Sequence, residues 1–336
     1  MQTVPILLIA AAVLSIPISF AQSQTESGVQ PSIPHVTLTF TRIDCTPTAT
    51  YTTASGINNA GQVVGDCGGT AGYVWTPNSI RPINFPGATA TFAADINSNG
   101  EIAGIYDAPD RSGARGFLLD GGVYKIIFDA QGVQTVVNGI NAAGDMVGFY
   151  TDSVGVTHGF LDHAGALTAI DVPEAADTIA YGINLAGQIV GFYIGQTGEF
   201  RGFELRGGRF TYLDVPNAIQ TQPYGINTSG DISGSFNDTS GQHGFLLHHG
   251  SYQIFNVPGT SDTSAVAIND KGHVVGSHVD PKLQQLQGYA SNLVKFIKVM
   301  DPNGTMTGPT GINNSDTIVG TFIDSQGVET GFMATR

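Results

Sequence analysis

Charged residues are scarce in this chain, and positive charge is the scarcer kind. Only 12% of the 336 residues are charged, and 13 Lys and Arg stand against 27 Asp and Glu, which gives a formal net charge of −14. An acidic surface without a basic cluster repels nucleic-acid phosphate. We therefore expect no nucleic-acid partner.

Helical patterns are also missing. Gly accounts for 45 residues, and long stretches of Leu, Glu and Lys do not occur. The apolar residues instead fall in short runs rich in Val, Ile, Phe and Tyr, and these runs are separated by Gly, Asn and Asp. That pattern is typical of short strands joined by tight turns, so it indicates an all-β protein.

Only one apolar run is long, namely residues 4–20 (VPILLIAAAVLSIPISF), and no Lys or Arg precedes it. The run contains two prolines, is short for a membrane span and ends in the small-x-small pattern Ser19-Phe20-Ala21. We interpret residues 1–21 as a signal peptide cleaved near Ala21, with a membrane anchor as the alternative, and residues 22–34 as a flexible lead-in. The mature chain is then secreted or periplasmic, without a membrane span.

Cysteine occurs twice, at Cys45 and Cys67. In an exported protein two cysteines can pair, and closing a loop of this length would stabilise the fold by about 3 kcal/mol in the chain-entropy model. The alternative is two isolated thiols. Spacing alone does not decide between them.

One phrase recurs along the chain. It is Gly-Ile-Asn, with Asp95 and Ala267 replacing Gly in two copies, and in six copies a further Gly follows the Asn after two residues. Its Asn stands at Asn58, Asn97, Asn141, Asn184, Asn227, Asn269 and Asn313. A second mark, Gly before an aromatic residue, keeps the same spacing at Tyr73, Phe117, Phe160, Phe203, Phe245, Tyr289 and Phe332. A period of about 43 residues indicates a solenoid or a propeller.

Residues 178–216 show what one copy contains. Four short runs, at 179–183, 188–193, 202–205 and 210–213, are joined by three hairpin connections, which predicts a four-stranded antiparallel meander. Asn and Gly form the turns. The Val190-Gly191 pair in the second run leaves out a side chain, and we expect this where neighbouring sheets approach closely.

The chain ends decide between an open array and a closed ring. The last copy stops at Gly331 to Ala334, a third strand, and so lacks its fourth. Residues 36–44 (VTLTFTRID) resemble a fourth strand without a copy of its own. Closure would join the two and leave no open sheet edge. We therefore predict that residues 35–336 form a single seven-bladed β-propeller of four antiparallel strands per blade, closed by the N-terminal strand.

The repeat resembles that of the extracellular HAF-repeat proteins of bacteria. Their pattern of Gly-Ile-Asn, Gly-x-Ile-Val-Gly and His-small-Phe is matched at residues 182–184, 187–191, 158–160 and 243–245. Other copies replace the His, and the seventh turn has Asp316 in place of Gly. The resemblance implies an exported repeat protein and carries no established activity.

Ligands of propellers usually bind over the central channel. They bind on the face that carries two sets of loops, those between the second and third strands of a blade and those that connect one blade to the next. The loops expected there are acidic, and their candidate ligand-binding residues are Asp107, Asp110, Asp152, Glu174, Asp177, Glu199, Asp238 and Asp280. Carboxylates from several blades can converge on a cation or a sugar. The alternative is that they form turns, because Asp after the second strand recurs in five copies whereas a catalytic acid should be singular.

No nucleophile elbow, zinc-protease, phosphate-loop or Cys-x-x-Cys motif occurs. We assign no catalytic or metal-binding residue and expect no cofactor. The favoured function is a non-enzymatic, monomeric propeller that binds a protein or a cell-envelope glycan through its loop faces. The alternative is an extracellular hydrolase or lyase of polysaccharide that uses loop carboxylates, and a deep acidic pocket containing a carboxylate with a raised pKa would favour it.

Overall fold

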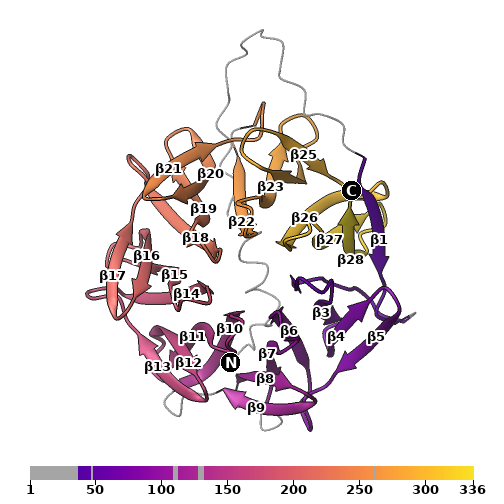
Figure 1. Cartoon of the computed structure of the whole chain (residues 1–336), viewed down its shortest axis with the longest axis horizontal. Coiled ribbons are helices and arrows are strands. Elements are labelled where there is room, and N and C mark those ends of the chain that lie inside the picture. Colours follow the sequence, from indigo (N-terminus) through magenta and orange to yellow (C-terminus); the bar gives the residue numbers. More distant parts are fainter. Residues whose placement is uncertain (1–36, 47, 109–112, 128–131, 261) are drawn as a thin grey trace. The chain divides into compact units, whose positions relative to one another are not determined.

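A computed structural model describes residues 37–46, 48–108, 113–127, 132–260 and 262–336. Within these residues, seven four-stranded antiparallel sheets stand around a central axis, which confirms the seven-bladed β-propeller (Figure 1). The described residues contain no helix long and apolar enough to cross a membrane. The predicted signal peptide and lead-in lie outside the described residues.

The first three blades each take four consecutive strands, counted from the channel outward. Blade 1 contains β2 (Gly56–Ile57), β3 (Val63–Cys67), β4 (Ala71–Thr76) and β5 (Ser79–Ile83). Blade 2 contains β6 (Thr91–Ile96), β7 (Ile102–Asp107), β8 (Ala114–Asp120) and β9 (Val123–Ile127). Blade 3 contains β10 (Gly132–Ile140), β11 (Met146–Asp152), β12 (Thr157–His163) and β13 (Ala166–Ile170).

The next three blades repeat this order. Blade 4 contains β14 (Asp177–Ile183), β15 (Ile189–Ile194), β16 (Phe200–Arg206) and β17 (Arg209–Leu213). Blade 5 contains β18 (Gln220–Ile226), β19 (Ile232–Asp238), β20 (Gly241–His248) and β21 (Ser251–Phe255). Blade 6 contains β22 (Thr263–Ile268), β23 (Val274–Asp280), β24 (Gln285–Ser291) and β25 (Phe296–Val299).

Blade 7 is built from both ends of the ring. It contains β26 (Gly304–Ile312), β27 (Ile318–Asp324), β28 (Glu329–Thr335) and, as its outermost strand, β1 (Thr39–Ile43). The antiparallel register places Thr39 opposite Thr335 and Arg42 opposite Phe332, so the predicted closure is confirmed (Figure 1). Ile43 at the end of β1 is fully buried. Apolar packing therefore stabilises the pairing of β1 with β28 in addition to the backbone hydrogen bonds.

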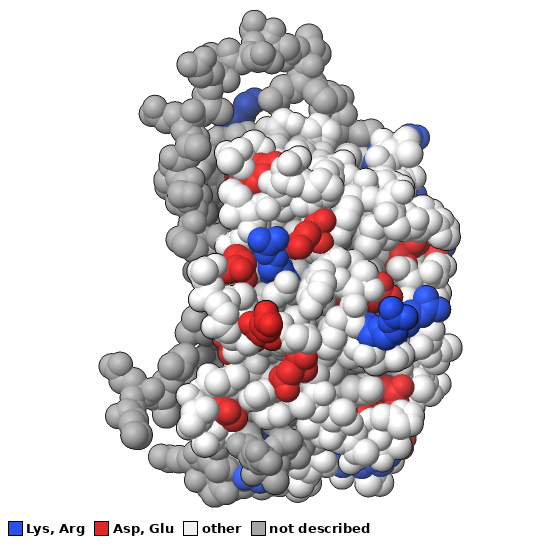
Figure 2. Space-filling view, turned by 90° about the vertical axis from the view of Figure 1, so that its left-hand side faces the viewer, with Lys and Arg blue, Asp and Glu red and all other residues white. Residues whose placement is uncertain are grey.

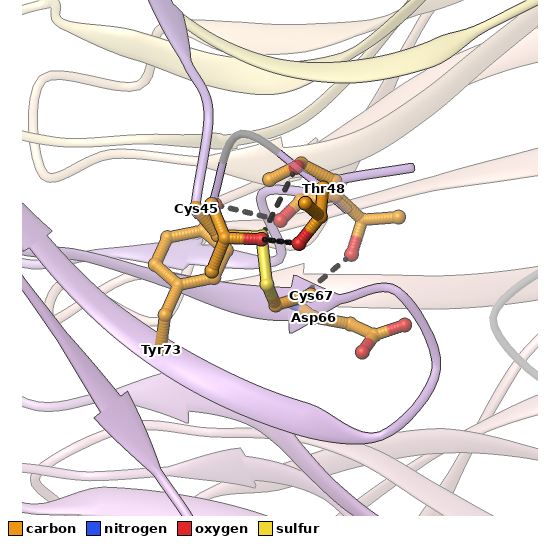
Figure 3. The surroundings of a disulfide bond; sticks show 8 residues. Cys45, Thr48, Asp66, Cys67 and Tyr73 are labelled. Carbon is orange, nitrogen blue, oxygen red and sulfur yellow. Dashed lines mark hydrogen bonds between the residues drawn. A yellow bond between two sulfur atoms is a disulfide. The ribbon is translucent and has the colours of Figure 1, made fainter. Parts of the chain in front are cut away.

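A disulfide reinforces the junction between the last blade and the first (Figure 3). Cys45 follows β1, Cys67 ends β3, and their Cα atoms are 5.8 Å apart. Pairing was left open by the sequence, and the structure joins the two residues. The closing strand is therefore linked covalently to blade 1.

A closed circle of hydrogen bonds joins the seven recurring asparagines. Each Nδ2 donates to the backbone carbonyl of the Asn in the next blade, and Asn313 returns to Asn58 at 3.2 Å. Each Oδ1 also accepts the amides two and four residues later, which forms the predicted turn. All seven side chains are at most 5% exposed. We call one face of the ring the Asn face. It carries the Asn turns between first and second strands and also the turns between third and fourth strands.

Apolar side chains fill the space between neighbouring blades. One cluster joins Ile170 of blade 3 to Ile189 and Phe203 of blade 4, and equivalent clusters recur around the ring. The aromatic residue after Gly in each third strand is at most 1% exposed. Each blade thus buries one face against the next, which a single copy cannot do alone.

The role predicted for the Val-Gly pair needs a correction. A Cβ on Gly191 would lie 2.1 Å from the carbonyl oxygen of Ile179, which belongs to the same blade. A β-bulge between Ala180 and Gly182 shifts the register of β14 just beside this contact. Gly is therefore required by a close approach inside the blade and not between sheets.

Candidate functional site

The predicted ligand-binding acids mostly bind their own loops. Asp152 accepts the amides of Val154 and Val156, and Asp238 accepts the amide and hydroxyl of Ser240. Asp280 accepts the amides two and three residues later, and Asp324, the same position in blade 7, accepts those two and four residues later. These hydrogen bonds correspond to the turn role.

The remaining predicted acids also lie apart. Asp177 accepts the amide of Thr157 from the previous blade, and Glu199 accepts the hydroxyl of Thr197. Burial raises the pKa of Asp107, and Glu174 has a positive φ of 66°. Asp110 lies outside the described residues. Among the described members, no hydrogen bond or ion pair joins any two of these acids.

The His of the His-small-Phe motif joins the ends of strands within a blade. His158 contacts Asp171 at 2.8 Å and Asp152 at 3.5 Å, and His243 contacts Asn256 and Asp238. Partial burial acts to lower the pKa of His158, but the two carboxylates outweigh it and raise that pKa. Hydrogen bonds from Ser240, and then from His243, lower the pKa of Asp238 to about 2.

Carboxylates with a raised pKa occur elsewhere. Burial raises the pKa of Asp95, on the channel-facing strand β6, to about 6, against hydrogen bonds from the amides of Ile96 and Ile140. Burial also raises the pKa of Asp66, beside the disulfide, and of Glu329, whose pKa the charge of Asp66 raises further (Figure 3). Among the described residues, no group of three or more His, Cys, Asp and Glu could hold a metal ion.

A pocket of about 410 Å³ lies on the Asn face between blades 4 and 5. Its blade 4 wall includes Glu204, Arg206 and Tyr212, and its blade 5 wall includes His249 and Tyr252. The volume is in the usual range of small-molecule sites, about 300–1,000 Å³. This pocket is called the 4–5 cleft below.

Glu204 creates the polar character of the 4–5 cleft. The residue after the buried aromatic of each third strand points toward the next blade, and in the other six blades it is aliphatic. These residues are Val74, Leu118, Leu161, Leu246, Ala290 and Met333. Only blade 4 places a carboxylate there. Gln188 donates to its Oε1 at 2.8 Å, which fixes the side chain.

The floor of the cleft is held by Asp231, which is 6% exposed. Its two oxygens accept hydrogen bonds from Asn227 Nδ2 at 3.1 Å and from His248 Nδ1 at 2.7 Å. Glu204 is half-buried above it, whereas Arg206 and His249 are exposed at the rim. Polarity thus changes with depth, from acceptors inside to nitrogen-bearing groups outside.

One tyrosine ring, that of Tyr252, completes the walls. Tyr212 pairs with Phe203, which packs toward blade 3, so the Tyr212 ring lies on the other face of blade 4, near Tyr193. Burial and the nearby Asp214 carboxylate raise the pKa of Tyr252 to about 12, so its hydroxyl remains a proton donor near neutral pH. The cleft therefore offers one tyrosine ring, a carboxylate acceptor and a guanidinium donor within one small volume.

An equivalent pocket between blades 1 and 2 has different chemistry. It measures about 360 Å³, and Val74 takes the place of Glu204, Pro82 that of Tyr212 and Gly121 that of His249. Tyr124 corresponds to Tyr252. The same groove is therefore largely apolar in one place and polar in another, which singles out the 4–5 cleft.

Sequence reasoning missed Glu204 because one copy was interpreted by itself, and there Glu204 looks like an ordinary polar residue in a strand. Alignment of all seven copies shows one carboxylate in an otherwise aliphatic position. The acids that the sequence selected were numerous and repeated, which is the signature of turn formation.

Comparisons with known proteins support the fold. No family model and no curated protein sequence matches the chain. The β-propeller domain of the Trilobed protease from Pyrococcus furiosus is similar at 10% identity and a TM-score of 0.58, covering 84% of this chain and 95% of that one. YCF48 bound to D1 peptide matches at 11% identity and a TM-score of 0.53, covering 91% and 100%.

The acylaminoacyl peptidase of Pyrococcus horikoshii is also similar, at 10% identity and a TM-score of 0.57, over 87% of this chain and 53% of that one. The chain thus spans about half the length of that peptidase. At these identities the likeness concerns the propeller fold alone. The three proteins differ in what they do, so the function must be argued from the site.

Proposed function

We propose that this propeller is an exported binding protein that holds a glycan in the 4–5 cleft without cleaving it. The observation that carries the proposal is Glu204, a fixed carboxylate at a position that is aliphatic in every other blade. A polar side chain at a blade interface reduces apolar packing, so a binding role explains why it is present.

The neighbours of Glu204 suit a sugar. Arg206 follows on the same side of β16, so a carboxylate acceptor and a guanidinium donor stand side by side for adjacent hydroxyl groups. Tyr252 adds flat apolar surface for the C–H groups of a pyranose ring. Export is supported by the Cys45–Cys67 disulfide, because disulfides persist in oxidising compartments.

The test replaces Glu204 with the apolar residue that other blades have at the same position. Glu204→Leu places in blade 4 the residue that blades 2, 3 and 5 have, and it removes the acceptor. We expect the purified full-length protein to bind members of a panel of cell-envelope and extracellular polysaccharides, and the variant to bind them at least about tenfold more weakly, as measured by calorimetry. The variant should melt no earlier than the original protein, because it gains apolar packing.

Arg81→Ala, in the equivalent pocket between blades 1 and 2, is the matched control and should leave binding unchanged. Equal affinity of the Glu204→Leu variant would contradict the proposal. Release of reducing ends from the bound polysaccharide would favour the hydrolase or lyase alternative.

A further inference from the structure

Two positive side chains face each other at the rim of the 4–5 cleft. The turn that joins β16 to β17 has the sequence Arg206-Gly207-Gly208-Arg209, and the register places Arg206 directly opposite Arg209. Like charges opposite each other in a hairpin repel. A neighbouring carboxylate would remove this cost.

Among the described residues, no carboxylate forms an ion pair with either arginine, and the nearest acid on the same strand, Glu204, accepts a hydrogen bond from Gln188. Arg42, Lys125, Arg201 and Lys271 each form an ion pair with Asp, but Arg206 and Arg209 form none, and both are exposed. In a protein with a net charge of −14, acids are plentiful. Figure 2 shows how few Lys and Arg side chains one side of the molecule presents. The pair is therefore a local excess of positive charge on an acidic protein.

The corresponding turn of blade 5 adds a second unusual feature. His248 and His249 are adjacent, with ring centroids 4.1 Å apart, and His249 lines the cleft. His249 has a positive φ of 48°, at the turn position where blades 2 and 4 have Gly121 and Gly207. Ala164 at the same position of blade 3, and Leu293 in the corresponding turn of blade 6, also have a positive φ, so what distinguishes blade 5 is the histidine pair and not the backbone conformation.

We infer that the glycan bound in the 4–5 cleft carries an anionic substituent, a carboxylate or an ester-linked sulfate, which sits between Arg206 and His249. This inference rests on the proposed function and names the class of ligand for the same site. The substituent meets the rim, where Arg206 offers a planar set of donors that fits an oxyanion with two parallel hydrogen bonds. The ring hydroxyls meet Glu204 and the floor.

The arrangement separates charge by depth. The two acids of the cleft are inside and already accept hydrogen bonds, Glu204 from Gln188 and Asp231 from Asn227 and His248. The exposed nitrogen-bearing groups are all at the rim. An anion placed at the rim therefore meets the guanidinium groups of Arg206 and Arg209 first, whereas an anion placed at the floor would meet carboxylates. The orientation of the ligand follows from this order.

The experiment uses matched acidic and neutral glycans on the full-length protein. The probes are oligosaccharides of polygalacturonate, hyaluronan and alginate, each with its carboxyl-reduced counterpart, and a sulfated galactan with its desulfated counterpart. Calorimetry should show that at least one acidic member binds about tenfold or more tightly than its neutral counterpart, and that raising NaCl from about 0.05 M to about 0.5 M weakens it. The pair that shows the difference identifies carboxylate or sulfate.

Three variants locate the effect. Arg206→Gln with Arg209→Gln should reduce affinity for the acidic member about tenfold and affinity for the neutral member clearly less, because the neutral member loses only the hydroxyl contact of Arg206. His249→Gly should reduce acidic binding while the melting temperature stays equal or rises, because Gly adopts this turn conformation without strain. Arg81→Gln is the control in the other pocket.

The outcomes separate the two ideas. Equal binding of acidic and neutral members, with loss of both in Glu204→Leu, overturns the anionic substituent and leaves the proposed function intact. Unchanged acidic binding in the double arginine variant overturns it as well. Absence of binding to every probe counts against both.

Discussion

The position after the buried aromatic of each third strand is the one at which blade 4 departs from the other six blades. Six of the seven side chains are aliphatic and pack toward the next blade, and Glu204 is the exception. A second exception lies at another position, the first residue of the recurring Gly-Ile-Asn phrase. Blade 2 has Asp95 there, whereas the other blades have Gly or Ala. Glu204 lines a pocket, whereas Asp95 lies beside the channel and accepts amides of blades 2 and 3.

Asp95 should make stability depend on pH. Burial raises its pKa from 3.8 to about 6, so the folded protein holds a proton there that the unfolded chain has released. Its contribution is complete below about pH 4 and is lost as the pH rises through about 6, which amounts to at most about 3 kcal/mol.

Asp95→Asn cannot titrate, so it should lack this decline. Urea unfolding of both proteins between about pH 4 and about pH 7 measures it. If the free energy of unfolding changed with pH in the same way for both proteins, Asp95 would ionise in the folded state as it does in the unfolded chain, which would contradict the prediction.

At the scale of the strand and turn, the recurring Asn does two things. Asn141 accepts the amides of Ala143 and Asp145 within its own turn, and it donates to Asp145 and to the carbonyl of Asn184 in the next blade. It is 4% exposed, so removing the side chain would leave buried partners unpaired.

Asn141→Ala should therefore lower the free energy of unfolding by about 2–4 kcal/mol, measured in urea. Asn78→Ala, at an exposed turn residue without a side-chain hydrogen bond in the described part of the chain, should change it by less than about 0.5 kcal/mol. Glycan binding should be the same in both variants, because neither residue lines the 4–5 cleft. A loss at position 141 no greater than that at position 78 would contradict the role of the asparagine circle.

The strands were predictable from the sequence because Asn and Gly mark the turns within each copy. The four runs in residues 178–216 correspond to β14 to β17, and the unmatched strand at the N-terminus corresponds to β1. The link from one Asn to the next was not predictable, since it depends on how far apart neighbouring blades place their turns. The same holds for the close contact of Gly191 with Ile179, which depends on a bulge in the strand beside it.

The candidate site was less accessible to sequence reasoning than the fold. Asp152, Asp238 and Asp280 attracted attention because acidic loops are easy to see, but each is occupied by amides of its own loop. Glu204 is a single letter inside a strand. Its meaning depends on two facts that only the assembled ring supplies, namely that it faces the next blade and that His249 and Tyr252 stand opposite.

At the scale of the whole ring, the closure between blade 7 and β1 and the 4–5 cleft lie in different places. Blade 7 closes on β1, and the Cys45–Cys67 disulfide ties that strand to blade 1, where Asp66 and Glu329 are buried with a raised pKa. The 4–5 cleft belongs to blades that have no part in closure. Binding and ring closure can therefore be altered separately.

Hydrogen–deuterium exchange of the full-length protein, with and without the tightest-binding oligosaccharide of the panel, tests the central claim most directly. The account predicts slower exchange at residues 204–213 and 229–252, which form the two walls of the 4–5 cleft, and no change at residues 74–83 and 119–124 in the equivalent pocket. Protection confined to the loops that carry Asp152 and Asp280, or spread evenly over all blades, would contradict it.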